Sequence, residues 1–153
     1  MQGVESCPEC GTIWEKGVTC TDHFHQALFW ESEYPAYTLA VHHYLVLCYH
    51  LQHPRLYSRE MLPDAVKLLG DFLNGATTEY IRERNRDVRD SGKRTTKITG
   101  TPDSYGEYAQ PVRWTMTIAD IVGDSVEHYD HNVRAWAQAI YNDLKESGNV
   151  PAA

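Results

Sequence analysis

The sequence lacks any long hydrophobic run. No stretch of its 153 residues approaches the ~20 consecutive apolar residues with which a helix crosses a bilayer. The residues after Met1 also lack the basic start and apolar run of a secretory signal. We therefore expect no membrane partner and a cytoplasmic location.

Positive charge is also scarce. The chain has 14 Lys and Arg against 21 Asp and Glu, which gives a formal net charge of −7 with His neutral. An acidic chain repels phosphate polymers, so nucleic-acid binding is disfavoured. Because 42% of the residues are hydrophobic, the composition is that of a globular protein and not of a disordered chain. The length is typical of one domain, and we expect residues 1–153 to form it.

Familiar catalytic motifs are missing as well. Nothing in the sequence resembles a nucleophile elbow, a phosphate-binding loop or a dinucleotide-binding turn. The sequence therefore names no reaction. The sequence is compatible with either a protein or a small molecule as the binding partner.

The apolar periodicity predicts a mainly α fold. We expect a bundle of about four to five helices with a small irregular lobe at the N-terminus. A weak strand candidate covers 95–99. The expected segments are a zinc-knuckle lobe over 1–20, helices over 21–89, a long loop and short helix over 90–123, and a C-terminal helix over 124–147. The expected helices within 21–89 cover 21–33, about 35–53, 58–73 and 77–89, the first capped by Thr21 or Asp22.

Two capping motifs and one apolar stripe define the C-terminal third. Thr117-x-x-Asp120 predicts a capped short helix, and Asp124-x-x-Glu127 predicts the start of the last helix. His128 and His131 lie opposite the stripe and are expected to face solvent. The stripe, predicted to be core, comprises Val126, Tyr129, Val133, Trp136, Ala137, Ile140 and Leu144.

Three of the four cysteines gather near the N-terminus. Cys7-Pro-Glu-Cys10-Gly11 has the spacing of a zinc knuckle, in which a tight turn presents two sulfurs to one ion and Gly relieves the backbone. Cys20 follows, and Cys20-x2-His23 repeats the short spacing. A redox pair is the other interpretation of Cys-x2-Cys, but the third cysteine and the nearby histidines favour Zn2+. Cys48, in an apolar helix, is expected to be an inert core thiol.

The fourth ligand is less well defined by the sequence. We favour His23, and His25 also lies close in the chain. His42, His43, His50 and His53 are alternatives if their helix packs beside the knuckle. Four protein ligands would close the coordination shell, which is typical of a structural site and not of a catalytic one.

The same histidine-rich helix offers candidate catalytic residues. At 100° per residue, His42, Tyr49 and His53 share one face, where imidazole and phenol groups could exchange protons. The simpler interpretation is that these are buried side chains bonded to backbone or tyrosine partners.

Several short motifs occur together in this sequence. Through these motifs the chain resembles a bacterial family of uncharacterised proteins with an N-terminal Cys-Pro-x-Cys knuckle and a His-His…Gln-His-Pro helix. The resemblance covers most of the chain and leaves out the loop over about 84–110. The resemblance implies a small intracellular zinc-type domain without an established activity. It also implies that a fourth ligand shared by the family would be His42, His43 or His53. The motifs are Cys7-Pro-x-Cys10, Cys20 with Phe24, Pro35-Ala-Tyr37, His42-His43, Tyr49-x-x-Gln52-His53-Pro54, Ser58-Arg59, Trp114-x-x-Thr117-Ile-Ala-Asp120 and Val133-x-x-Trp136-Ala.

Two functional hypotheses follow from the sequence. The first is a binding or interaction protein in which zinc is purely structural. The alternative is a metal-dependent enzyme with a histidine-rich cleft, by analogy of architecture with DinB-like helical bundles that hold metal on three histidines.

Overall fold

The computed structural model describes residues 5–75, 79, 83 and 99–150. Over these residues the chain is mainly α-helical, as predicted, and β pairing is limited to isolated bridges. An irregular lobe precedes the first helix. The helices are α1 (Cys20–Glu33), α2 (Pro35–Gln52), α3 (Met61–Leu73), α5 (Ile118–Val122) and α6 (Tyr129–Glu146), with 3₁₀ turns η1 (Glu15–Gly17), η2 (Pro54–Leu56) and η3 (Val126–His128).

The helix starts show which capping motifs the fold uses. Thr19 caps α1, not Thr21 or Asp22, and forms a reciprocal capping box with Asp22. Thr117 and Asp120 form the predicted capping box of α5. These boxes satisfy backbone N–H groups that the first turn of a helix leaves without partners.

The start of α6 differs from the prediction. Asp124 and Glu127 do not form a capping box; instead the Asp124 carboxylate accepts hydrogen bonds from Asn132 Nδ2 at 2.8 Å and from the Ser125 amide at 2.7 Å. These bonds lower the pKa of Asp124 to about 2. The chain first forms η3, and Val126 is therefore only half-buried. The other six residues of the predicted stripe are buried, whereas His128 and His131 are exposed.

Two further differences concern the middle of the chain. The helix predicted over 58–73 begins at Met61, because Ser58 Oγ accepts the Met61 amide at 3.1 Å and holds the preceding residues in a turn. The helix predicted over 77–89 and the strand predicted over 95–99 lie outside the described residues, except for 79, 83 and Thr99. Thr99 forms an isolated bridge with Tyr57.

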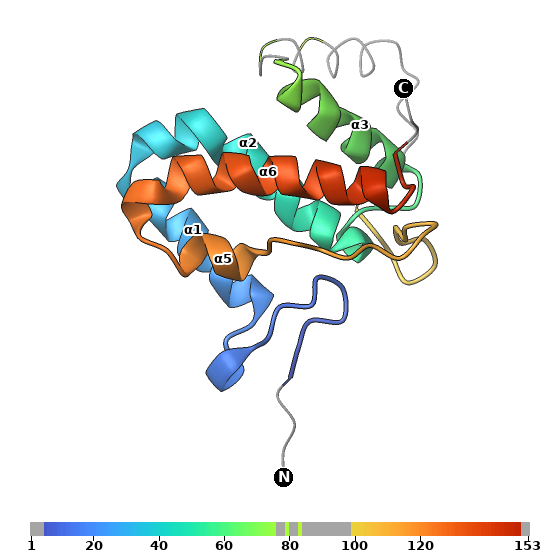
Figure 1. The fold of residues 1–153 in the computed structure, drawn as a ribbon, viewed down its shortest axis with the longest axis horizontal. Coiled ribbons are helices and arrows are strands. Elements are labelled where there is room, and N and C mark those ends of the chain that lie inside the picture. Colours follow the sequence, from blue (N-terminus) through green and yellow to red (C-terminus); the bar gives the residue numbers. More distant parts are fainter. Residues whose placement is uncertain (1–4, 76–78, 80–82, 84–98, 151–153) are drawn as a thin grey trace.

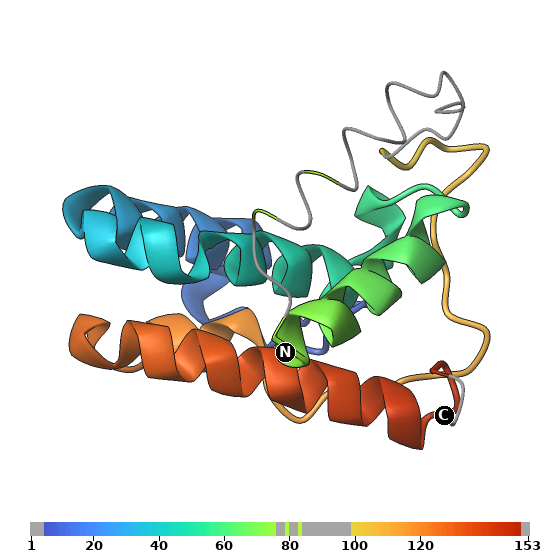
Figure 2. The same ribbon diagram turned by 90° about the horizontal axis from the view of Figure 1, so that it is seen from above.

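Helix α2 is the central element, as its nearly all-round apolar surface predicts. It packs against α1, α3 and α6, and it runs beside α6 in the same direction (Figures 1 and 2). The irregular lobe lies at the N-terminal end of α1, and an extended segment passes the end of α2 on its way to α5 (Figure 1). None of the described helices combines the length and apolarity needed to cross a bilayer.

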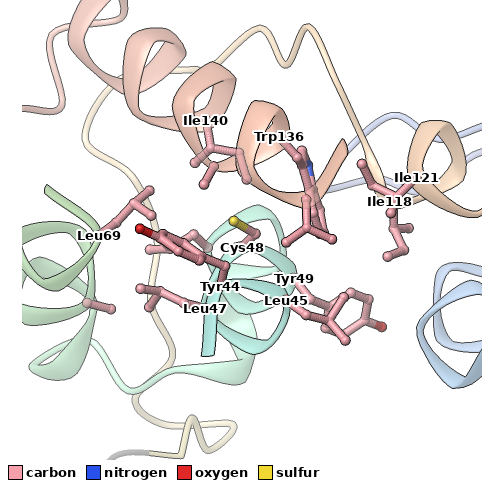
Figure 3. Close-up of a cluster of buried hydrophobic side chains, with 14 of the residues drawn as sticks. Tyr44, Leu45, Leu47, Cys48, Tyr49, Leu69, Ile118, Ile121, Trp136 and Ile140 are labelled. Atoms are coloured by element: carbon pink, nitrogen blue, oxygen red, sulfur yellow. The ribbon is translucent and has the colours of Figure 1, made fainter. Parts of the chain in front are cut away.

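The core fills the space between α2, α6, α3 and α5. Figure 3 shows side chains from all four helices meeting around Cys48, which is fully buried. Burial raises the pKa of the Cys48 thiol and keeps it protonated, in agreement with an inert core residue. Trp136 is the largest fully buried side chain and faces Ile118 and Ile121.

We expect Trp136→Ala to lower the free energy of unfolding by about 3–5 kcal/mol, because it removes a fully buried indole and leaves a cavity. Urea denaturation would measure the change. The exposed Gln138 on the same helix offers a control, since Gln138→Ala should change stability by no more than about 0.5 kcal/mol. Equal stability of the two variants would contradict this view of the core.

Candidate metal centre

The irregular lobe is a tight turn that points two sulfurs in one direction. The Gly11 amide donates to Cys7 O at 3.0 Å and the Cys7 amide donates to Thr12 O at 2.8 Å. Gly11 has φ +82°, a conformation that favours glycine and closes the turn. Cys7 and Cys10 are therefore both buried on the inner side of the lobe, as the knuckle spacing predicts.

Cys20 is the first residue of α1, so the capping box that fixes the start of this helix also fixes its sulfur. Its Sγ lies 3.5 Å from Cys10 Sγ and accepts a hydrogen bond from Trp14 Nε1 at 3.3 Å. Thr12 Oγ1 lies 3.1 Å from Cys10 Sγ. Such contacts orient sulfur ligands and stabilise them as thiolates.

His53 completes the group from the C-terminal end of α2, which lies beside the start of α1. It directly follows α2, and Pro54 prevents the helix from continuing. One ligand atom from each of Cys7, Cys10, Cys20 and His53 lies within 4.8 Å of all the others. The four residues are between 4% and 6% exposed, so the group is closed to bulk solvent.

The hydrogen bonds of His53 leave one ring nitrogen for the sulfurs. Nδ1 lies 2.7 Å from Tyr49 O, to which it can only donate. Among the described residues, Nε2 is one of three buried side-chain atoms without a hydrogen-bond partner. A carbonyl that fixes one ring nitrogen and leaves the other for the ion is the usual arrangement of a metal-binding histidine. Three thiols and this nitrogen could therefore bind a metal ion.

Charge is distributed unevenly over the metal-free group. Hydrogen bonds with Cys10 and Cys20 lower the pKa of Cys7 against the effect of burial, whereas hydrogen bonds with Cys20 and Cys7, together with burial, raise that of Cys10. Burial acts to lower the pKa of His53, but the sulfurs of Cys20 and Cys7 outweigh it and raise this pKa to about 10. A metal that takes all four ligands displaces the protons that remain.

The histidines favoured from sequence spacing lie elsewhere. His23 is half-buried and lines an open cleft beside the lobe, outside the group of four, and His25 is exposed. A spacing in the sequence places His23 near Cys20 along the chain, but the packing of α2 brings His53 to the sulfurs. The alternative ligand His53, and not His23, is thus the histidine that the structure places with the cysteines.

The remaining histidines of α2 have other contacts. His43 packs its ring against Tyr44 and Phe72, with centroids 4.5 and 4.3 Å away. His50 Nδ1 lies 2.8 Å from Val46 O, and its ring packs on Tyr57. Burial lowers the pKa of both imidazoles. Both side chains are half-buried, and these contacts with backbone and aromatic groups place them outside the group of four.

The candidate catalytic face is divided between two places. The ring centroids of Tyr49 and His53 are 4.4 Å apart, and the Tyr49 ring stacks on that of Phe24. His42 instead lies near the middle of α2, with Nδ1 2.7 Å from Glu31 Oε1. His42 and His53 therefore do not share a cleft, because they are separated by about three helical turns along the chain.

Sequence reasoning missed the buried carboxylate of Glu31. Glu31 is 3% exposed, and its second oxygen accepts a hydrogen bond from the buried hydroxyl of Tyr129. This acid joins α1, α2 and α6, and it raises the pKa of Tyr129 further beyond the effect of burial. A signal was available: Glu31 follows Ala27 by one turn, on the buried side of α1.

The fold and the site together define a helical protein with a closed Cys3His group. The chain belongs to a family of unknown function, DUF5946, whose sequence profile matches residues 5–145. Comparisons with curated proteins and with solved structures each found no match.

Glu31→Ala tests the importance of the buried acid. We expect the free energy of unfolding to fall by about 1–3 kcal/mol, since the Tyr129 hydroxyl loses its buried acceptor. Chemical denaturation of this variant should be compared with that of Glu33→Ala, which removes an exposed carboxylate from the same helix. A loss of stability that is the same in both variants would show that the Glu31 contacts contribute nothing.

Proposed function

We propose that this protein binds one structural zinc ion through Cys7, Cys10, Cys20 and His53 and acts as a cytoplasmic binding or interaction protein. The observation that carries the proposal is the convergence of four buried donor atoms from separate segments. Thiol ligands persist in a reducing compartment, which supports the cytoplasmic part of the proposal.

The donor set supports zinc as the metal. Three thiolates and one imidazole suit Zn2+, which prefers four tetrahedral sulfur and nitrogen ligands. Mg2+ and Ca2+ require oxygen ligands and do not match this set. The closed set of four protein ligands also supports a structural role, because a catalytic zinc ion keeps one position for water or substrate.

The position of the group explains what the ion would stabilise. Cys7 and Cys10 come from the lobe, Cys20 starts α1 and His53 ends α2. Within the lobe, over 5–19, only Cys7, Cys10 and Thr12 are buried. So small a segment has little apolar area with which to hold itself against the helices. Zinc would supply the missing free energy by tying the lobe to both helices.

The alternative of a metal-dependent enzyme draws less support. Its three candidate residues do not meet in one place: Tyr49 packs between His53 and Phe24 beside the cysteines, whereas His42 contacts Glu31. A protein or small-molecule partner fits the proposed role, and the net charge of −7 disfavours nucleic acid.

We expect the purified protein to contain close to one zinc ion per chain and Cys7→Ser or Cys10→Ser to lose both metal and solubility. Zinc binding at a structural site contributes folding free energy, on the order of 10 kcal/mol in small zinc peptides. Elemental analysis and thermal melting would measure the two effects. A metal-free protein that melts at the same temperature as the metal-loaded one would rule out the structural role.

His53→Ala separates the two candidate fourth ligands. We expect this variant to lose zinc, because it removes the ligand nitrogen that faces the sulfurs. His23→Ala, the matched control, should retain the metal. Titration with a chromogenic zinc chelator would compare their affinities. Zinc loss from the His23 variant and retention by the His53 variant would reverse the assignment.

A further inference from the structure

A groove lined with aromatic rings and prolines lies beside the candidate metal centre. Its volume is about 510 Å³. Two of its rings, those of Tyr108 and Trp114, meet edge to face with centroids 5.9 Å apart. We call it the aromatic groove; the residues that give it this character are Tyr105, Tyr108, Trp114, Pro8, Pro54 and Pro111.

Two walls of the aromatic groove are continuous with the proposed zinc ligands. Pro8 and Glu9 lie between Cys7 and Cys10, and Pro54 directly follows His53. The walls are also joined to each other, because the Arg55 amide donates to Glu9 Oε2 at 3.2 Å. A metal ion that fixes the lobe against the end of α2 would therefore fix the shape of the groove.

The third wall of the aromatic groove is the segment from Tyr105 to Trp114, which is held against the end of α2 and the lobe. The Gly106 amide donates to Tyr57 O at 2.8 Å, and a Cβ at this position would lie 2.6 Å from Pro54 O. Only glycine permits so close an approach of two backbones. The Tyr108 hydroxyl donates to Leu51 O, and Trp114 Nε1 donates to Glu9 O at 3.2 Å. Two rings of the groove, those of Tyr108 and Trp114, are thus held in place by hydrogen bonds to the backbone.

The hydrogen bonds of the lining restrict what the groove can recognise. Its three prolines have no N–H. The Arg55, Gly106 and Gln110 amides, the Trp114 indole and the Tyr108 hydroxyl already donate to other groups. Phosphate groups and added β-strands are recognised by free donors. These groups therefore offer flat apolar contact, and the cationic donor of the lining is the Arg55 guanidinium, which lies over the Tyr105 ring.

Charge at the groove favours a basic occupant. Glu9 and Glu107 contribute two carboxylates to the lining, against the single guanidinium of Arg55. That guanidinium lies over the Tyr105 ring, 4.5 Å from its centroid. The whole chain is also acidic, with a net charge of −7. A segment that carries Arg or Lys would complement both the groove and the surrounding field.

We propose that the aromatic groove binds an extended, proline-rich segment of a partner protein that also carries basic residues. The prolines of a polyproline helix carry no N–H, its backbone carbonyls stay hydrated, and its ring faces pack on aromatic side chains. The acidic side chains Glu9 and Glu107 would contact the basic residues. This inference rests on the proposed structural zinc, because the ion would fix the walls formed by Pro8 and Pro54.

A fluorescein-labelled polyproline peptide with arginines at both ends would test the proposal by fluorescence anisotropy against the metal-loaded protein. We expect saturable binding that Tyr105→Ala or Glu107→Lys weakens about tenfold, the effect of losing a single important interface residue. Phe29→Ala and Glu15→Lys, which remove an exposed ring and an exposed acid outside the groove, should leave binding unchanged. Circular dichroism and zinc content would show that each variant is folded.

Control ligands distinguish the other outcomes. No binding by the metal-loaded protein, or equal binding by the Tyr105→Ala variant, would overturn the proposal. So would equal binding of a glycine-serine peptide with the same arginines, or preference for an oligothymidine strand. If the protein binds the proline peptide but contains no metal, the proposal of a structural zinc ion is refuted and the proposal of a peptide-binding groove stands. If the protein contains zinc but binds no peptide, only the proposal of a peptide-binding groove is refuted.

Discussion

The convergence of four buried donor atoms is the constraint on which the rest of this structure depends. Cys7 and Cys10 lie in the lobe, whereas Cys20 and His53 lie at the ends of α1 and α2 that face it. Bringing these atoms within 4.8 Å of one another fixes the lobe against two helices. A buried group of thiols and imidazole is costly unless its polar atoms find partners, and one metal ion would satisfy all four.

The helical part of the molecule holds together by different means. Around α2, ordinary apolar burial supplies the core, with Trp136 at its centre and Cys48 as an inert filler. Buried polar groups also lie among these helices, and Glu31 is one of them. The Glu31 carboxylate joins three helices through His42 and Tyr129, far along α2 from His53. The middle of α2 and the residue that follows its C-terminus thus carry different polar clusters, which is why His42 and His53 do not share a cleft.

Function, in the proposed view, belongs to the surface that the metal centre organises. A turn between two cysteines and a turn after the histidine ligand form facing walls of the aromatic groove. The segment from Tyr105 to Trp114 closes it, held by Gly106 and by the indole of Trp114. In such an arrangement the ion need not perform chemistry. Its contribution would be preorganisation, since a groove fixed before binding loses less entropy when a partner binds.

The sequence by itself determined the local features of this protein. Periodicity identified the mainly α fold, the central helix and the buried face of α6, and the Cys-x2-Cys turn indicated the sulfur group; these signals act over a few residues. Only the tertiary structure decided which histidine meets the cysteines, because His53 is 33 residues from Cys20 and arrives there through the packing of α2 on α1. It likewise decided the contacts of Glu31 and the first residue of α6, where Asp124 bonds to Asn132 instead of capping. Spacing fixes what neighbours in sequence can do, whereas contacts between distant segments depend on how whole helices pack.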